Sequence, residues 1–175
     1  MLTATDPLGF TTTNTYDAKG NLLSTTLPSP DGVIPPSTTS FSYDSKGQLL
    51  TITDPLNNVS TLTYTAAGLV ETVTDAQNHV TRYEYDARGN RTAVVDALNQ
   101  RTTFEYDARN RLKKITYPDL TTTQFAYDTR GRRTFVTDQN GKVTTYAYDD
   151  ADRLISVTDA QTPTPGLTQY RELQL

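Results

Sequence analysis

The chain has 175 residues, of which 35% are hydrophobic, and it carries a net charge of −4 and no cysteine. This mildly acidic balance disfavours a nucleic-acid partner, which basic surfaces attract, and the missing cysteines exclude disulfides and thiolate metal sites. No apolar run reaches the length of a membrane-spanning helix, so no membrane span is expected.

The first elements in chain order are a strand remnant at residues 1–5 and a turn at residues 6–9. A regular hairpin is expected from Phe10 to Leu27. Residues 29–36, Ser-Pro-Asp-Gly-Val-Ile-Pro-Pro, then lengthen the following connection. Because proline cannot donate to a strand ladder, this Pro-rich insertion is expected to be an exposed loop.

A Tyr-Asp pair recurs along the whole chain. Successive repeat tyrosines stand 21 residues apart, except that the insertion separates the first two by 27. Together with glycines four residues after the tyrosines, these pairs form the structural repeat signature, in which Thr65 replaces one aspartate: Tyr16, Asp17, Gly20, Tyr43, Asp44, Gly47, Tyr64, Gly68, Tyr85, Asp86, Gly89, Tyr106, Asp107, Tyr127, Asp128, Gly131, Tyr148 and Asp149. A fixed period of this kind predicts one supersecondary unit stacked on itself.

Two kinds of turn alternate between the strands. The Tyr-Asp turn, as in Asp86-Ala87-Arg88-Gly89, has Asp where its carboxylate can accept from the backbone and Gly where φ is positive. The linking turn, as in Asp54-Pro55-Leu56-Asn57, ends in a residue that tolerates the left-handed conformation. The six- or seven-residue runs between turns are rich in Thr, Val, Ile, Tyr and Phe. These runs favour strands and leave no room for a three-turn helix.

The sequence therefore predicts an all-β fold, a repetitive antiparallel meander of β-hairpins built from 21-residue repeats. Residues 1–160 are expected to hold about seven repeats, and residues 161–175 a degenerate or truncated repeat or tail. No helix is expected.

Strand alternation predicts a double row of large side chains on one face, such as Phe104 and Tyr106, and burial of this row is the default expectation. The strands that follow the Tyr-Asp turns, here called return strands, are less regular. Leu49 and Ile52 stand three residues apart, a spacing that points to opposite faces. Either a β-bulge resets the strand or both faces are partly buried.

No catalytic, cofactor-binding or metal site is predicted, and the chain is not expected to be an enzyme. His79 is the single histidine and lies in a turn, where a solvated side chain is the simplest interpretation. Turn capping explains the aspartates without calcium, which stays a minor alternative. The basic residues beside the turns, Lys19, Lys46, Arg88, Arg109 and Arg130, are expected to be solvated turn charges.

The segments Tyr-Asp-x-x-Gly-x-Leu at residues 16–22 and 43–49 resemble the YD repeat of the Rhs family. That family includes bacterial polymorphic toxins, the shell subunits of insecticidal toxin complexes, and the animal teneurins. The resemblance covers roughly residues 1–160 and implies a β-sheet strip that spirals into a hollow shell. In the bacterial members such a shell encloses a toxic C-terminal polypeptide.

The resemblance implies that this chain is a non-catalytic structural segment of such a shell, forming a curved strip or partial β-shell. It also implies an extracellular or bacterial cell-surface location, although the first residues lack the features of a signal peptide. The expected partners are the remainder of a longer YD-repeat protein or its enclosed cargo.

The alternative is a cell-surface adhesion module that binds carbohydrate or a host surface protein through its Thr-rich and Arg-bearing edges. The terminal strands would present unpaired backbone groups, so edge-to-edge self-association is a further expectation.

Overall fold

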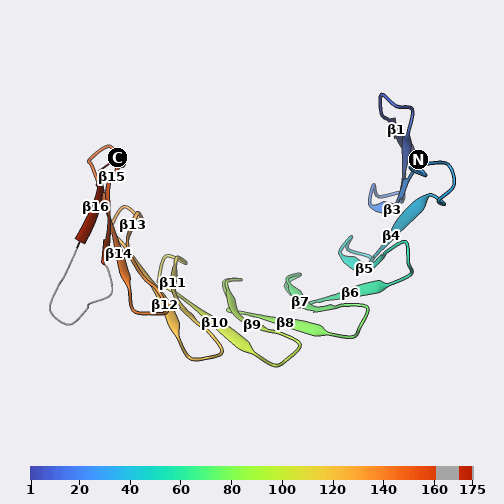
Figure 1. Ribbon diagram of the computed structural model, residues 1–175. Helices are drawn as coiled ribbons and strands as arrows, with labels where there is room; N and C mark the ends of the chain where they lie inside the picture. The colour runs from blue at the N-terminus through green and yellow to red at the C-terminus, as the bar shows by residue number, and fades with distance from the viewer. Residues whose placement is uncertain (161–169, 175) are drawn as a thin grey trace. The chain divides into compact units, whose positions relative to one another are not determined.

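The computed structural model describes residues 1–160 and 170–174, which contain sixteen β-strands and no helix (Figure 1). They fall into two compact units, residues 1–83 and 84–175. In each unit, strands that follow one another in sequence are antiparallel neighbours in an open sheet. The predicted all-β hairpin meander is confirmed. Most of the tail predicted at residues 161–175 lies outside the described residues.

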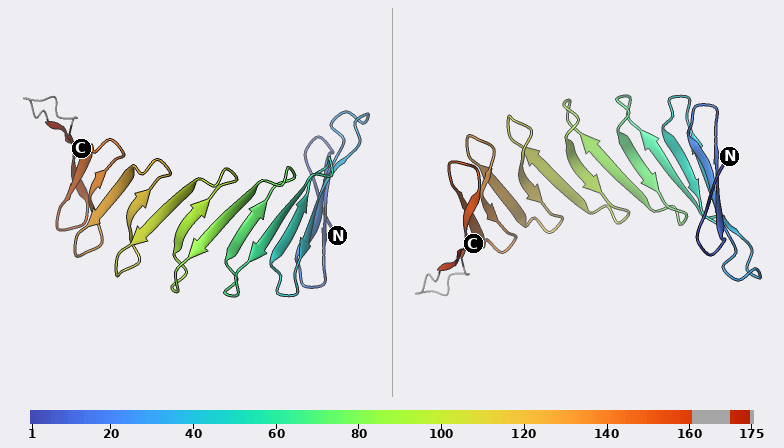
Figure 2. Two further views of the ribbon diagram at one scale, coloured as in Figure 1. Left: turned by 90° about the horizontal axis from the view of Figure 1, so that it is seen from below. Right: turned by 90° about the horizontal axis from the view of Figure 1, so that it is seen from above.

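The strands are short and evenly spaced. The first unit contains β1 (Leu2–Thr5), β2 (Thr11–Tyr16), β3 (Leu22–Leu27), β4 (Ser37–Tyr43), β5 (Leu49–Thr53), β6 (Val59–Tyr64), β7 (Val70–Thr74) and the start of β8 (Val80–Tyr85). The second contains β9 (Arg91–Val95), β10 (Arg101–Tyr106), β11 (Leu112–Thr116), β12 (Thr122–Tyr127), β13 (Arg133–Thr137), β14 (Val143–Tyr148), β15 (Leu154–Ala160) and β16 (Tyr170–Gln174). Figure 2 shows that short turns join most of these strands, whereas a longer loop joins β3 to β4.

The Tyr-Asp turn is held by its aspartate. In the turn of Asp86, the Gly89 amide donates to the Asp86 carbonyl. The Asp86 carboxylate oxygen Oδ1 accepts from the amides of Arg88 and Asn90, each at 2.9 Å. Gly89 has a φ of 85°. A type I turn followed by a left-handed residue suits the twist of a hairpin, so the sequence dictates this geometry locally.

Six turns of the described residues have a non-glycine residue in the left-handed position. They are Asn57, Asn78, Asn99, Asn110, Leu120 and Asp152, with φ between 59° and 67°. Asn and Asp adopt this conformation readily, because their short polar side chains bond locally, whereas for leucine it costs about 1–2 kcal/mol. The turn that ends at Leu120 is therefore the strained member of the set.

A β-bulge after the Tyr-Asp turn explains the irregular return strands. Ser42 pairs with Thr51 but Tyr43 pairs with Leu49, which leaves Leu50 as an extra residue. The same shift occurs beside the repeat tyrosines of β2, β6, β10, β12 and β14. The bulge brings Leu49 to the same face of the sheet as Ile52, so the first of the two alternatives, a β-bulge that resets the strand, is confirmed.

Burial is shallow, because each unit is a single layer of strands. Among the described residues only Ala93 is fully buried. The rings of Phe104, Tyr106, Phe125 and Tyr127 are half-buried. The expected double row of large side chains is present, but its burial is partial, since a single layer covers its rings from one side only.

Candidate functional site

Successive hairpins pair over only part of their length. Between β5 and β6 the ladder runs from Thr53–Val59 beside the linking turn to Thr51–Thr61, and it stops there. The ladders of β9 with β10, β11 with β12 and β13 with β14 are equally short. The Tyr-Asp ends of neighbouring hairpins therefore lack backbone pairing to each other, and side chains span the gap.

The repeat tyrosines provide the first bridge across this gap. Each is the last residue of its strand, in β2, β4, β6, β8, β10, β12 and β14. Their hydroxyls donate to carbonyls of the preceding hairpin, as Tyr64 to Leu49 at 2.7 Å, Tyr106 to Arg91 at 3.0 Å, Tyr127 to Leu112 at 2.8 Å and Tyr148 to Arg133 at 3.0 Å. Each acceptor carbonyl belongs to the first residue of a return strand. The backbone ladder between that strand and the next hairpin ends before it reaches this residue. The hydroxyl thus satisfies a carbonyl that this ladder does not reach.

Basic side chains of the Tyr-Asp turns form a second bridge. Lys19 Nζ donates to the Ser45 carbonyl at 2.7 Å, and Arg109 Nη1 donates to the Thr129 carbonyl, also at 2.7 Å. Arg130 Nη1 reaches the Asp150 carbonyl at 2.9 Å. These residues are exposed, as expected of solvated turn charges, but the side chains of Lys19, Arg109 and Arg130 are also anchored to the next turn. The stacking of hairpins creates these contacts, so a single repeat does not reveal them.

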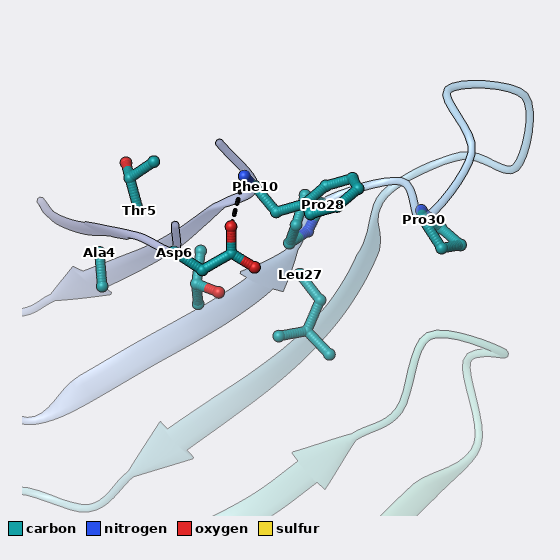
Figure 3. Close-up of a pocket in the computed structure, with 8 residues that line it drawn as sticks. Ala4, Thr5, Asp6, Phe10, Leu27, Pro28 and Pro30 are labelled. Atoms are coloured by element: carbon teal, nitrogen blue, oxygen red, sulfur yellow. Dashed lines mark hydrogen bonds between the residues drawn. The ribbon is translucent and has the colours of Figure 1, made fainter. Parts of the chain in front are cut away.

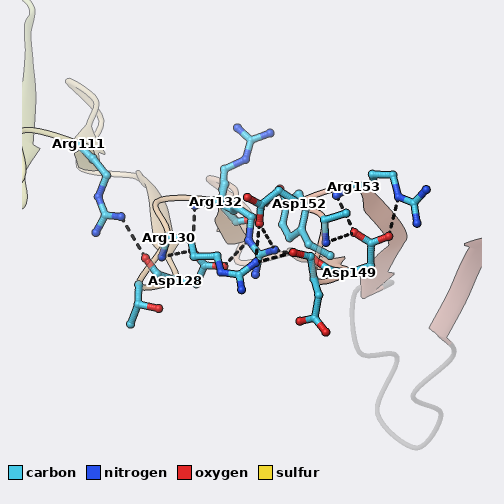
Figure 4. Close-up of polar contacts among 12 residues, drawn as sticks. Arg111, Asp128, Arg130, Arg132, Asp149, Asp152 and Arg153 are labelled. Atoms are coloured by element: carbon cyan, nitrogen blue, oxygen red, sulfur yellow. Dashed lines mark hydrogen bonds and ion pairs between the residues drawn. The ribbon is translucent and has the colours of Figure 1, made fainter.

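Arg132 forms the most extensive bridge (Figure 4). Its Nε donates to Asp128 Oδ2 of its own turn at 2.6 Å, and its Nη1 reaches the next turn at the Asp149 carbonyl, at 2.9 Å, and at Asp152 Oδ1, at 2.7 Å. Arg111 repeats the pattern, with Nε on Asp107 Oδ2 at 2.7 Å and Nη1 on the Asp128 carbonyl at 3.2 Å. The fork of the guanidinium group suits such double contacts.

The same arginines cover aromatic rings. The guanidinium carbon of Arg111 lies 4.5 Å from the centre of the Tyr127 ring, and that of Arg132 lies 4.9 Å from the Tyr148 ring. Arg133 lies in the same way 4.8 Å from the Tyr146 ring. Cation–π contacts of this kind contribute about 0.5–1 kcal/mol at exposed sites. These rings of the second unit are therefore not an uncovered stacking platform.

The turn carboxylates are stabilised in their charged form. Hydrogen bonds from the Arg111 side chain and amide lower the pKa of Asp107 from 3.8 to about 2. The side-chain amides of Asn21 and Asn90 lower the pKa of Asp17 and Asp86 in the same direction. A carboxylate that accepts several hydrogen bonds favours ionisation, so these turns keep their acceptors charged at neutral pH.

Polar groups in the gap bind one another. A cavity of about 560 Å³ lies between the turns of Asp86 and Asp107. There Arg88 Nη1 and Asn90 Nδ2 both donate to Asn110 Oδ1, at 3.2 and 3.1 Å. This cavity is a consequence of the bridged gap.

The histidine and the acidic side chains of the described residues do not form a metal site. His79 is exposed, and its Nδ1 lies 2.9 Å from Asp75 Oδ2 in the same turn. Across residues 1–160 and 170–174, no group of three or more His, Asp or Glu side chains is arranged to hold a metal ion. No helix in this part of the chain is long and apolar enough to cross a membrane.

The fold and the bridged Tyr-Asp turns define a class of stacked β-hairpin repeat proteins. The family model of the Teneurin YD-shell matches residues 9–169, and the chain therefore belongs to the YD-repeat family that it describes. The resemblance drawn from the Tyr-Asp repeats is confirmed. No curated protein sequence matches the chain.

Several solved structures share this fold. TcdB2-TccC3 without its hypervariable C-terminal region has a TM-score of 0.77 and 19% identity over 99% of this chain, and TcdB2-TccC3-TEV a TM-score of 0.76 at the same identity and coverage. A mutant Tc holotoxin pore of Photorhabdus luminescens has a TM-score of 0.74 and 19% identity over 94% of this chain. The chain spans 10% of the first two solved chains and 9% of the third.

Proposed function

We propose that this chain is a non-catalytic wall section of a YD-repeat shell that encloses a polypeptide. The observation that carries the proposal is the bridging of successive hairpins by Tyr127 and Arg132 and their equivalents. These contacts use the chain's own groups and need no ligand, so they hold successive hairpins together as a continuous wall would need. The fold shared with the toxin-complex structures supports the same role.

The finer parts of the proposal follow from those relatives. The enclosed polypeptide is a C-terminal toxin, the shell continues in a longer protein, and its place of action is extracellular or on the surface of a bacterium. The small share of the solved chains that this chain spans supports its being one section of a larger wall.

The first test is the size and protease resistance of the native polypeptide. An antibody raised against residues 1–160 should detect, in extracts of the source organism, a polypeptide far larger than the 19.4 kDa of this chain. Limited proteolysis of that polypeptide should spare an internal segment, and release it only after the wall is denatured. Detection of the free 19.4 kDa chain alone would sink the proposal.

A cell-surface binding module is the second candidate, because Tyr106 is only half-buried. Exposed aromatic faces can stack on sugars. A glycan array separates the two functions: saturable binding that is lost in Tyr106→Ala favours the module, and no binding favours the wall section.

A further inference from the structure

Two neighbouring gaps between Tyr-Asp turns each contain a pair of guanidinium groups. These groups stand two and four residues after a turn aspartate, and they belong to Arg109 and Arg111 in one gap and to Arg130 and Arg132 in the next. The second group of each pair has the same surroundings. It bonds to its own turn aspartate and to a carbonyl of the next turn, and it lies over the ring of the next repeat tyrosine. The chain itself therefore shows how such a gap binds a guanidinium group.

The gap between the turns of Asp86 and Asp107 differs at one position. Arg88 is the equivalent of Arg109, and it bonds across the gap to Asn110 Oδ1 at 3.2 Å. The residue four after the aspartate, however, is Asn90 and not an arginine. Its short side chain reaches Asp86 Oδ2 at 2.9 Å and Asn110 Oδ1 at 3.1 Å. The turn residues of this gap thus provide one positive charge fewer than those of each of the next two gaps.

A hollow takes the place of the arginine side chain. The cavity of about 560 Å³ in this gap is lined by Asp86, Tyr106 and Asp107, among others. These three residues stand 21 positions before the three that the Arg111 guanidinium group contacts. Within the described residues, no guanidinium group covers the Tyr106 ring and no side chain donates to the Asp107 carbonyl.

These groups suit a guanidinium ion better than an ammonium ion. A planar guanidinium ion stacks on an aromatic ring while it donates in its own plane, whereas an ammonium ion is a compact and strongly hydrated charge. Each oxygen of the Asp86 carboxylate can accept more than one hydrogen bond, so Oδ2 can accept from a ligand in addition to its present donor. Arg88 does not exclude a second cation, because Arg130 and Arg132 both donate to Asp152 Oδ1 in their gap, at 3.0 and 2.7 Å.

The cavity beside β1 has a different chemistry (Figure 3). Its volume is about 540 Å³, and its walls include Phe10, Leu27 and Pro28. Its carboxylate, Asp6, uses Oδ1 to accept from the amides of Leu8 and Phe10, each at 2.9 Å. No other repeat of the described residues shows a side chain seated in an equivalent of this cavity, so we infer no ligand for it.

We propose that the gap between the turns of Asp86 and Asp107 binds a guanidinium group, supplied by an arginine side chain of a polypeptide or by a small arginine-like molecule. The group lies over the Tyr106 ring and donates to Asp86 Oδ2 and to the Asp107 carbonyl, as Arg111 does one repeat later. The inference goes beyond the wall-section role and does not depend on it, because all of these contacts lie between two neighbouring turns.

The test is an NMR titration of the full isotope-labelled chain with three probes at matched ionic strength. The probes are free L-arginine, arginine capped by acetyl and methylamide groups, and lysine with the same caps. An arginine probe should shift the amide signals of the turns of Asp86 and Asp107 in a saturable way, and the lysine probe should bind more weakly by about tenfold or more. Binding of the capped arginine alone identifies a polypeptide as the source, binding of free arginine alone identifies a small molecule, and binding of both admits either source.

Two matched variants locate the site. Asn90→Arg supplies the guanidinium group from the chain itself, so it should weaken binding of the arginine probes by about tenfold or more. Gln100 follows Asp96 as Asn90 follows Asp86, and its amide donates to the turn aspartate in the same way. Gln100→Arg therefore adds the same charge to a linking turn and should leave the affinity unchanged. Circular dichroism checks that both variants fold.

Several results would overturn the proposal. They are equal binding of the arginine and lysine probes, equal effects of the two variants, and no binding of either arginine probe. Signal shifts confined to the gap between the turns of Asp17 and Asp44, which has a cavity of about 410 Å³, would also overturn it, because the ligand would then lie in another gap.

Discussion

The hydroxyl of Tyr127 donates to the carbonyl of Leu112 at 2.8 Å, and Leu112 in turn pairs with Tyr106 of the preceding strand. Tyr106 makes the equivalent bond to the Arg91 carbonyl at 3.0 Å. Tyr64, Tyr127 and Tyr148 therefore contact the hairpin before them at the residue that the previous repeat tyrosine faces. The bonds couple neighbouring repeats where their backbone ladder has ended.

Removing the Tyr127 hydroxyl should weaken this coupling. We expect Tyr127→Phe to lower the free energy of unfolding by about 0.5–1.5 kcal/mol, the usual net contribution of one hydrogen bond. Denaturant titration measures the change. Hydrogen exchange should also become faster in β11 and β12, because the loss is local.

Tyr146→Phe is the matched control. Tyr146 lies two residues before a repeat tyrosine and its ring contacts Arg133, but its hydroxyl makes no hydrogen bond within the described residues. Its removal should leave the stability nearly unchanged. A loss equal to that of Tyr127→Phe would show that the ring environment, and not the bond to Leu112, determines the effect.

Relief of the strained turn should stabilise the chain. Leu120 has a φ of 67° and is 81% exposed, so its side chain adds little burial. Leu120→Asn should raise the stability by about 1 kcal/mol, since asparagine tolerates the left-handed conformation. Thermal unfolding should shift upward by roughly 2–4 °C for a chain of this size.

Leu98→Asn provides the comparison for that variant. Leu98 is 76% exposed in another linking turn, where Asn99 and not Leu98 takes the positive φ. The melting temperature should hardly change. An equal rise in both variants would mean that removing exposed apolar surface, not backbone strain, stabilises the chain.

Arg132 should contribute more to stability than Arg153. Its side chain is 23% exposed and joins two turns, whereas that of Arg153 is 79% exposed and, among the described residues, bonds to Asp149 of its own turn. Arg132→Ala should therefore lower the unfolding midpoint in denaturant more than Arg153→Ala does. Arg132→Lys should restore little of the loss, because an ammonium group cannot reproduce the forked contacts. Indistinguishable midpoints for the two alanine variants would contradict a bridge between turns.

Acid should destabilise the turns in a defined window. The pKa of Asp107 is lowered in the folded state to about 2 from 3.8, so the folded state binds fewer protons than the unfolded state. Its contribution is thus fully present above pH 3.8 and is lost as the pH falls towards 2. Stability of Asp107→Asn should depend less on pH across this window. A Asp107 carboxyl that titrates near 3.8 in an NMR experiment would contradict the bond to Arg111.

Local chemistry made most of the fold predictable. Asp86 and Gly89 specify one turn and Asp54 and Asn57 another, so strand bounds followed from turn spacing. The resemblance to the YD-repeat family rested on the same residues. The bulge at Leu50 was one of two alternatives, because sequence alone does not reveal which residue a return strand leaves unpaired.

The bridges between hairpins could not be predicted in this way. The contact of Arg109 with the Thr129 carbonyl joins residues 20 positions apart, and it exists only because the two hairpins stack with their turns in line. A single repeat shows a basic residue beside a turn, for which solvation is the simplest interpretation. Whether such a side chain contacts the next turn depends on the register of strands that pair over three residues, such as β11 and β12.

In six hairpins the bulge leaves one residue of the return strand that faces no partner in the ladder. These residues are Leu23, Leu50, Glu71, Lys113, Thr134 and Ile155. Their chemistry ranges from aliphatic to acidic and basic, while the strands and turns around them keep one geometry. The side chains at these positions can therefore differ from one repeat to the next without a change in the strands and turns around them.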